Sequence, residues 1–185
     1  ERSRGLGDVY KRQGLGLLSF LASDEQLRSL QFWLLGSLGG ARWSAVQLVA
    51  ALCVLALALG LPLARTLNAL ALGESQAVLL GVPVERIKRR VIVVTALAVG
   101  AVTATTGIIG FIGLVAPHMV RLVAGPDHRW VLPGSALLGA SLVLVADAVA
   151  RTVAAPAELP LGVLTALVGV PFFLLLLRGA HGRRL

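Results

Sequence analysis

Two long stretches without charge constrain the fold of this chain most. Residues 91–120 carry no formally charged side chain in 30 positions, and residues 43–64 carry none in 22. A helix needs about 20 predominantly apolar residues to cross the hydrocarbon of a bilayer. The chain is 57% hydrophobic and 14% charged, with a mean hydropathy of +0.86, which is too apolar for a water-soluble domain of 185 residues. The sequence therefore predicts an all-α polytopic membrane protein, built as a helical bundle.

The charged and reactive residues exclude several classes of function. The net charge of +8 is placed at the ends of apolar stretches, so lipid head groups are the expected partner and nucleic acid is not. The single Cys53 lies in an apolar stretch and provides no disulfide. His118 has no second ligand at metal-binding spacing, so we expect it to pack or form hydrogen bonds, and we expect no metal. No nucleotide loop and no catalytic set is present, so we expect no cofactor and no enzyme.

Basic residues beside the apolar stretches predict the orientation in the membrane. Four of the five residues 86–90 are basic, and Arg121 and Arg129 follow residues 91–120. Basic residues beside apolar spans mark the cytoplasmic side. With both flanks cytoplasmic, residues 91–120 must enter the membrane and return.

Glycines provide the turn that this return needs. Gly107, Gly110 and Gly113 lie between residues 103 and 113, and we expect them to allow both the turn and close packing. Pro117 lies in the returning part and is assigned to the same packing and turning role. Thirty residues are too few for two comfortable spans, so at least one helix should be short or partly re-entrant and covered by its neighbours.

The N-terminal part contains the end of one further span. Residues 1–13 are polar and unlike the apolar residues 14–22, so we interpret them as a non-native or disordered leader, with a basic juxtamembrane arm as the alternative. Residues 14–22 are too short to cross. Ser23 then has the form of a helix cap, and the helix that it opens should end near Gly36. Residues 14–185 are treated as one membrane domain.

The C-terminal part contains two more crossings. Residues 131–150 should cross outward and residues 161–177 should cross back, with an external turn at 154–160 that contains Glu158. Arg178 follows this last span on the cytoplasmic side. The predicted bundle thus has about five full spans and the tail of one more.

Residues 73–90 form the longest charged interruption between apolar stretches. The pattern from Glu74 predicts a short helix that Gly81 can end in a left-handed conformation, and Pro83 delays the next helix until Val84. We expect a short helix, a sharp turn and a second short helix on the cytoplasmic face. A solvated connector and a functional loop account for this composition equally well.

Asp147 and Arg151 are one helical turn apart near the external end of their span. Such a pair can neutralise itself. The residues alone favour structural pairing over a role for Arg151 in binding an external partner.

Several motifs occur together in a recognisable order. They are Gly107-Ile-Ile-Gly-Phe-Ile-Gly-Leu-Val-Ala-Pro-His-Met-Val-Arg121, Gly125-Pro-Asp-His-Arg129, Leu132-Pro-Gly134, Ala146-Asp-Ala-Val-Ala-Arg151 and Ala157-Glu-Leu-Pro-Leu-Gly162. From about Gly14 to Arg178 the chain resembles the C-terminal half of the FecCD-type permeases. These are the membrane subunits of importers for iron-siderophores, haem and cobalamin that ATP-binding cassettes drive. Residues 1–13 match nothing in the family.

The resemblance implies partners on both faces of the membrane. Residues 73–90 lie where the family has the coupling helices that dock into an ATPase. Glu74, Ala77 and Gly81 look like the ATPase-contact motif, and Val82 and Arg86 adjoin it. The family pairs two permease copies and receives an external substrate-binding protein. Arg151 lies where the family has an arginine that faces acidic residues of that protein, with Glu158 nearby, and this raises docking above structural pairing.

The resemblance also suggests a substrate. Residues 24–40 and 81–86 look most similar to the haem-importing branch, with iron-siderophore as the second choice and cobalamin as the third. A passive channel is a less favoured alternative, because the spans show no continuous polar lining. The implied location is the plasma membrane of a bacterium.

Overall fold

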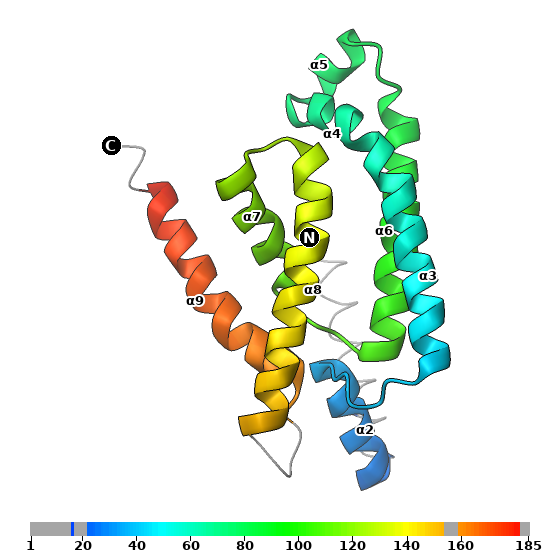
Figure 1. Cartoon of the computed structure of the whole chain (residues 1–185), viewed down its shortest axis with the longest axis vertical. Coiled ribbons are helices and arrows are strands. Elements are labelled where there is room, and N and C mark those ends of the chain that lie inside the picture. The colour runs from blue at the N-terminus through cyan, green and yellow to red at the C-terminus, as the bar shows by residue number, and fades with distance from the viewer. Residues whose placement is uncertain (1–15, 17–21, 154–158, 182–185) are drawn as a thin grey trace.

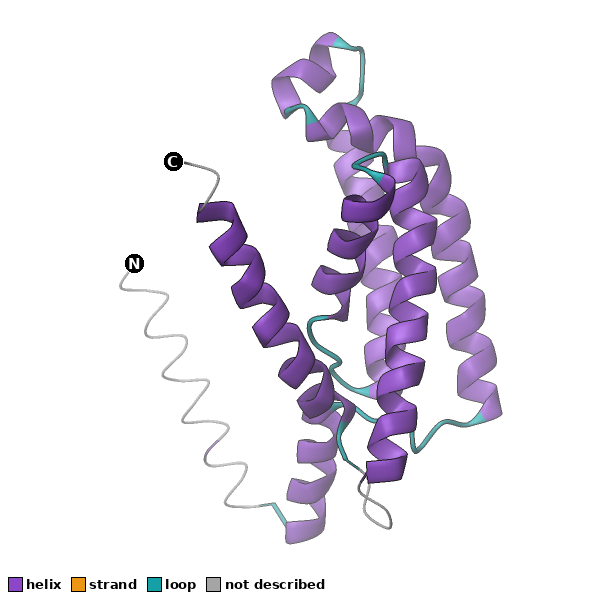
Figure 2. Cartoon of the chain, turned by 60° about the vertical axis from the view of Figure 1, so that its left-hand side comes forward, coloured by secondary structure: helices purple, strands orange, loops and turns teal. Residues whose placement is uncertain are grey.

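The computed structural model describes residues 16, 22–153 and 159–181, and within them it contains helices and no strand (Figures 1 and 2). The elements are α2 (Asp24–Leu35), α3 (Trp43–Gly60), the 3₁₀ turn η1 (Leu61–Leu63), α4 (Ala64–Ala71), α5 (Glu74–Leu79), α6 (Val84–Thr106), α7 (Ile112–Ala124), α8 (His128–Val153) and α9 (Leu161–His181). The predicted all-α class is confirmed. The leader 1–13 and Glu158 lie outside the described residues.

The long helices form two groups, α3 with α6 and α7 with α8 and α9, and the groups are linked near both ends of the molecule. α3 packs along α6, while α7 packs between α8 and α9 (Figure 1). α4 and α5 lie at one end of the molecule and α2 lies at the other (Figure 1). By the predicted orientation, the end with α5 is cytoplasmic and the end with α2 is external.

Two helical stretches in the described part are long and apolar enough to cross a membrane. They are Trp43–Ala71, which joins α3, η1 and α4, and His128–Val153. Pro62 lies in η1, where its missing N–H and fixed φ favour a tighter turn over a break. The predicted span at residues 43–64 therefore continues into α4.

Residues 91–120 form two helices, as predicted. α6 ends at Thr106 and α7 begins at Ile112, and the 13 residues of α7 extend only about 20 Å. The expectation of one short helix in this return is confirmed. The second short helix predicted inside residues 73–90 is wrong, because Val84 opens α6, which runs without interruption to Thr106. Pro83 caps α6, and nothing after it stops the helix before Gly107.

The external end is held together by backbone hydrogen bonds between three segments. Ile108 N–H donates to the Trp33 carbonyl at 3.1 Å, and Ser37 N–H donates to the Thr106 carbonyl at 2.8 Å. Leu161 N–H, at the start of α9, donates to the Gly36 carbonyl at 2.9 Å. We call this contact between the end of α2, residues 107–111 and the start of α9 the external junction.

Glycines allow the backbones of the external junction to approach so closely. A Cβ on Gly107 would overlap the Trp33 carbonyl oxygen, and one on Gly162 would overlap the Leu35 carbonyl oxygen. Gly36 and Gly107 also have positive φ, at 69° and 72°. The close-packing role predicted for Gly107 is therefore observed.

The other two glycines of the predicted turn have open surroundings. Among the described atoms, a Cβ on Gly110 or Gly113 would meet nothing within 4 Å. The Gly110 carbonyl accepts a hydrogen bond from Ile112 N–H at 2.8 Å, so Gly110 belongs to the turn. Pro117 lies inside α7, where it provides no N–H for the Gly113 carbonyl one turn earlier.

Candidate functional site

Gly81 follows the C-terminal end of α5 and ends that helix. Gly81 has φ of 76°, its N–H donates to the Val78 carbonyl at 2.9 Å, and Val82 N–H donates to the Ala77 carbonyl at 3.0 Å. This pair of bonds is the Schellman arrangement that ends a helix with a left-handed residue. The predicted left-handed role of Gly81 is confirmed.

Of the predicted ATPase-contact residues, Ala77 is buried and the others lie at the surface. Ala77 is 0% exposed, and Val84 and Ile87 at the start of α6 are also buried. Ala77 therefore belongs to the packing of α5 against its neighbours α4 and α6. Glu74, Val82 and Arg86 together line an open groove beside α5. Gly81 is exposed next to it.

Three consecutive apolar side chains at the tip of α5 were not singled out from the sequence. Val78, Leu79 and Leu80 are 60%, 80% and 65% exposed. They lie outside the apolar stretch Trp43–Ala71, at the end of the molecule that the predicted orientation makes cytoplasmic. Three adjacent apolar residues in an otherwise charged segment were the signal that could have identified them.

An ion pair connects α5 to α6. Lys88 Nζ lies 2.7 Å from Glu74 Oε2 and 3.8 Å from Glu85 Oε1. The hydrogen bond that Lys88 donates to Glu74 is the main cause that raises the pKa of Lys88 above its ordinary value of 10.5. Because the three groups are exposed, the pair orients α5 and adds little to overall stability.

A second polar cluster links α4 to the start of α8. Asn68 Nδ2 donates to Asp127 Oδ1 at 2.7 Å, and Asn68 Oδ1 accepts from His128 N–H at 2.9 Å and lies 2.7 Å from His128 Nδ1. Asp127 Oδ1 also accepts from Arg129 N–H at 2.9 Å, which caps α8. We call Asn68, Asp127 and His128 the α4–α8 clamp.

The hydrogen bonds of the α4–α8 clamp favour the ionised form of its carboxylate. The Arg129 backbone N–H, and after it the Asn68 amide, lower the pKa of Asp127 below its ordinary value of 3.8. Sequence reasoning placed residues 126–129 in a turn, and a break between α7 and α8 is observed there, while its cytoplasmic side stays a prediction. It did not connect Asn68 to this turn. Asn68 and Asp127 are 59 positions apart in the sequence, which leaves no local pattern to detect.

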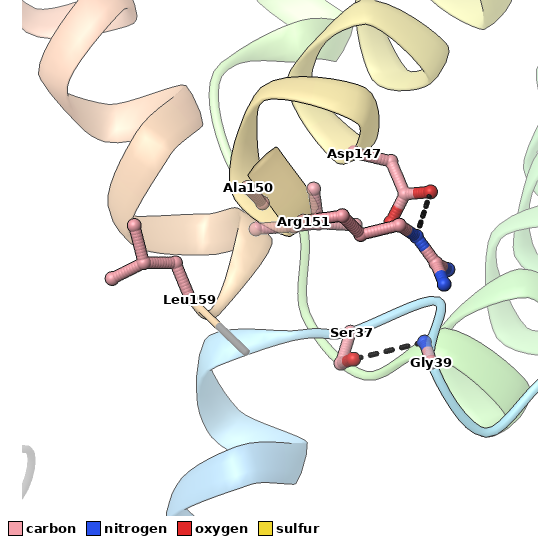
Figure 3. A pocket seen from close by; sticks show the side chains of 7 residues that line it. Ser37, Gly39, Asp147, Ala150, Arg151 and Leu159 are labelled. Atoms are coloured by element: carbon pink, nitrogen blue, oxygen red, sulfur yellow. Dashed lines mark hydrogen bonds and ion pairs between the residues drawn. The ribbon is translucent and has the colours of Figure 1, made fainter. Parts of the chain in front are cut away.

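At the external end, Arg151 and Asp147 form the predicted one-turn pair. Arg151 Nε donates to Asp147 Oδ2 at 2.7 Å, and the Arg151 side chain is 52% exposed while that of Asp147 is 20% exposed (Figure 3). Both line a small pocket with Ser37 and Gly39 of the α2–α3 connection. Structural pairing and exposure to an external partner are therefore compatible.

Near α7, sequence reasoning assigned a role to His118 but none to Phe111. His118 packs edge-on against Phe172 of α9, with ring centroids 6.1 Å apart, which agrees with the packing role expected for it. Phe111, which caps α7, has φ of 64° and lies where a Cβ on Gly169 of α9 would be. Because Phe111 is not a glycine, the sequence does not indicate that it adopts this left-handed conformation.

These features define a helical protein whose described part contains two stretches that are long and apolar enough to cross a membrane. The model of the FecCD transport family matches residues 15–179, so the chain belongs to that family. The protein is accordingly embedded in a membrane, and the transport role of its family points away from catalysis.

Known relatives agree with this assignment. The chain is 49% identical over 163 residues to the hemin transport system permease protein HmuU of Yersinia pestis, covering 88% of this chain and 49% of that protein. It is 46% identical over 169 residues to the cobalamin import system permease protein BtuC of Halobacterium salinarum, covering 90% and 45%. The chain thus spans about half the length of the curated relatives that it matches.

A solved structure has the same fold. It is an inward-facing conformation of an ABC transporter of metal-chelate type, with a TM-score of 0.82 and 34% sequence identity. The match covers 94% of this chain and 57% of that one.

Proposed function

We propose that this chain is the C-terminal half of the permease subunit of an ATP-binding-cassette importer that takes up haem or another iron chelate. The observation that carries the proposal is the match to the family over residues 15–179 together with a protruding α5 at the cytoplasmic end. The complete permease lies in the plasma membrane of a bacterium and works as a pair of copies.

The cytoplasmic partner is an ATPase subunit that receives α5. The exposed apolar tip Val78–Leu80 offers the kind of surface that a cleft in a partner can bury. Glu74, Val82 and Arg86 line the groove beside it, Gly81 ends the helix that carries it, and the buried Ala77 packs that helix against the rest of the protein. Closure of the ATPase pair moves α5, and the attached helices then change which side of the membrane has access to the path.

The external partner is a soluble protein that delivers the substrate. Arg151 lies at the external end of α8 with half of its side chain exposed, and its planar guanidinium can hold a carboxylate of that protein. Glu158 remains part of the same docking proposal.

Haem is the substrate favoured by the similarity to HmuU. Cobalamin is the second candidate, because a cobalamin permease is 46% identical over a similar length. Iron-siderophore stays an alternative within the same family.

The proposal is tested by uptake into proteoliposomes that hold the complete permease, its ATPase and its binding protein. We expect ATP-dependent accumulation of hemin in preference to cyanocobalamin and a ferric hydroxamate. An ATPase subunit that lacks its nucleotide-loop lysine is the control. Uptake that continues with this control would indicate a passive channel, and preferential uptake of cyanocobalamin would replace haem by the second candidate.

A further inference from the structure

The α4–α8 clamp lies where α4, the helix that precedes α5, contacts the start of α8. α4 continues α3 through η1, and only Leu72 and Gly73 separate it from α5. α4 packs against α5, so a displacement of α5 acts directly on α4. α4 also packs against α8, and the α4–α8 clamp lies at that contact.

We propose that Asn68 is a positioning residue that, through Asp127 and His128, carries the movement of α5 to α8. This inference rests on the proposed function, because it assumes that an ATPase moves α5. It adds a second route from α5 into the membrane, beside the direct one through α6. The juxtaposition of α4 with the capped end of α8 is the feature that supports it.

The chemistry of the α4–α8 clamp suits the transmission of a movement. The Asn68 amide uses its donor on Asp127 and its acceptor on the backbone and ring of His128, so its orientation is fixed by more than one bond. Two of these bonding groups are tied to the end of α8 itself. They are the Asp127 oxygen that caps the helix and the first helical N–H, at His128. A displacement of Asn68 therefore acts directly on the start of α8, through a backbone N–H and a capping carboxylate.

α8 is long enough to take this movement across the membrane. Its 26 residues extend about 39 Å, from His128 to the turn that carries Arg151. α7 and α9 pack against it and move with it. The α4–α8 clamp thus connects the cytoplasmic partner surface to the external one through a single helix.

The first test compares variants of the complete permease, reconstituted with its ATPase and binding protein. Asn68→Leu removes the amide but leaves Asp127 free to cap α8, so insertion and ATPase association should persist. We expect the substrate transported per ATP hydrolysed to fall about tenfold, a value within the range typical of coupling between two sites. Asp127→Asn should preserve the ratio, because its Oδ1 still accepts from Asn68 and Arg129. Thr66→Ala, two residues away on the same helix, is the matched control and should leave it unchanged.

A second test replaces the hydrogen bonds by a covalent link. Asn68→Cys combined with Asp127→Cys, in a Cys53→Ala background, should have the low ratio of Asn68→Leu while the thiols are free. A short thiol-to-thiol cross-linker should restore transport, because α4 and the end of α8 move together. Cross-linking that blocks transport would show that the two helices separate during the cycle and would overturn the inference.

The remaining outcomes are also decisive. An Asn68→Leu variant that keeps the unmodified ratio of transport to hydrolysis would refute the inference. One that no longer binds the ATPase would assign Asn68 to the folding of residues 73–90 instead. If the unmodified complex takes up no substrate at all, the proposed function has failed, and this outcome is distinct from either result.

Discussion

The two ends of the molecule are held together by different kinds of contact. At the external junction three backbone segments bond directly to one another, and Gly36, Gly107 and Gly162 leave no room for side chains between them. At the cytoplasmic end the links are made by side chains, with Asn68 reaching α8 and Lys88 reaching Glu74. The open space around Gly81 contrasts with the crowding at Gly107.

This difference implies that substitutions at the two ends have different consequences. A backbone contact without side chains has one geometry, and any added atom must displace a main chain. A contact made by side chains, whether part-buried as at Asn68 or exposed as at Lys88, can change while the helices stay intact. We infer that substitutions at the external junction affect folding, whereas those at the cytoplasmic end affect the transmission of movement.

The largest effect is expected at Gly107. Gly107→Ala should destabilise the fold by about 3 kcal/mol, because it combines a left-handed backbone with overlap of the Trp33 carbonyl. The measurement is the thermal unfolding of the complete permease in detergent. Gly110→Ala is the matched control, since its Cβ would meet open space and its φ is not positive. Equal destabilisation of the two variants would remove the contrast between the ends.

A smaller effect on stability and a clear effect on association are expected at Gly81. Gly81→Trp should insert normally, because nothing lies within 4 Å of its Cβ among the described atoms, and the left-handed φ costs about 1–2 kcal/mol locally. The bulky ring should prevent co-purification of the ATPase and abolish ATP-driven uptake. Gly81→Ala carries the same backbone cost without the bulk and should retain the ATPase. Unchanged uptake in Gly81→Trp would make residues 73–90 a solvated connector.

Arg151 should show a still smaller effect, confined to the external partner. Arg151→Glu should weaken association with the binding protein by roughly 0.2–1 kcal/mol for each exposed pair and make it less sensitive to salt. Insertion and basal ATP hydrolysis should be unaffected. Asp147→Asn removes only the intramolecular partner and should leave association intact. If Arg151→Glu fails to fold, pairing with Asp147 is its main role, and if association and its salt dependence persist, the docking assignment is wrong.

The smallest effect is expected from pH on the ion pair between α5 and α6. The pKa of Lys88 is raised, so the stabilisation from the pair is fully present below 10.5 and is lost as pH rises through the higher folded value. Spin labels at Ser75 and Arg89 should therefore report one distance distribution from about pH 6 to about pH 9, because Lys88 does not titrate there. A distribution that broadens near neutral pH would identify another titrating group as the one that holds α5.

Much of the fold follows from the sequence because its causes are local. The uncharged stretches, the basic flanks and Gly81 each act within a few residues, and they predict helices, orientation and the end of α5. The same reasoning placed the return between α6 and α7 at the correct residues. Proline and glycine positions were informative for the same reason, since they act on their own backbone.

Contacts between distant residues were decided only by the tertiary structure. The residues next to Asn68 in the sequence do not indicate its contact with Asp127, and those next to Gly107 do not indicate its contact with the Trp33 carbonyl. Each pair meets only after the helices pack. Ala77 belongs to a recognisable motif, yet only the tertiary structure shows that its side chain is buried. Gly107 and Gly110 are equivalent glycines in the sequence, and only the fold makes one of them indispensable to a close approach and leaves the other in open space.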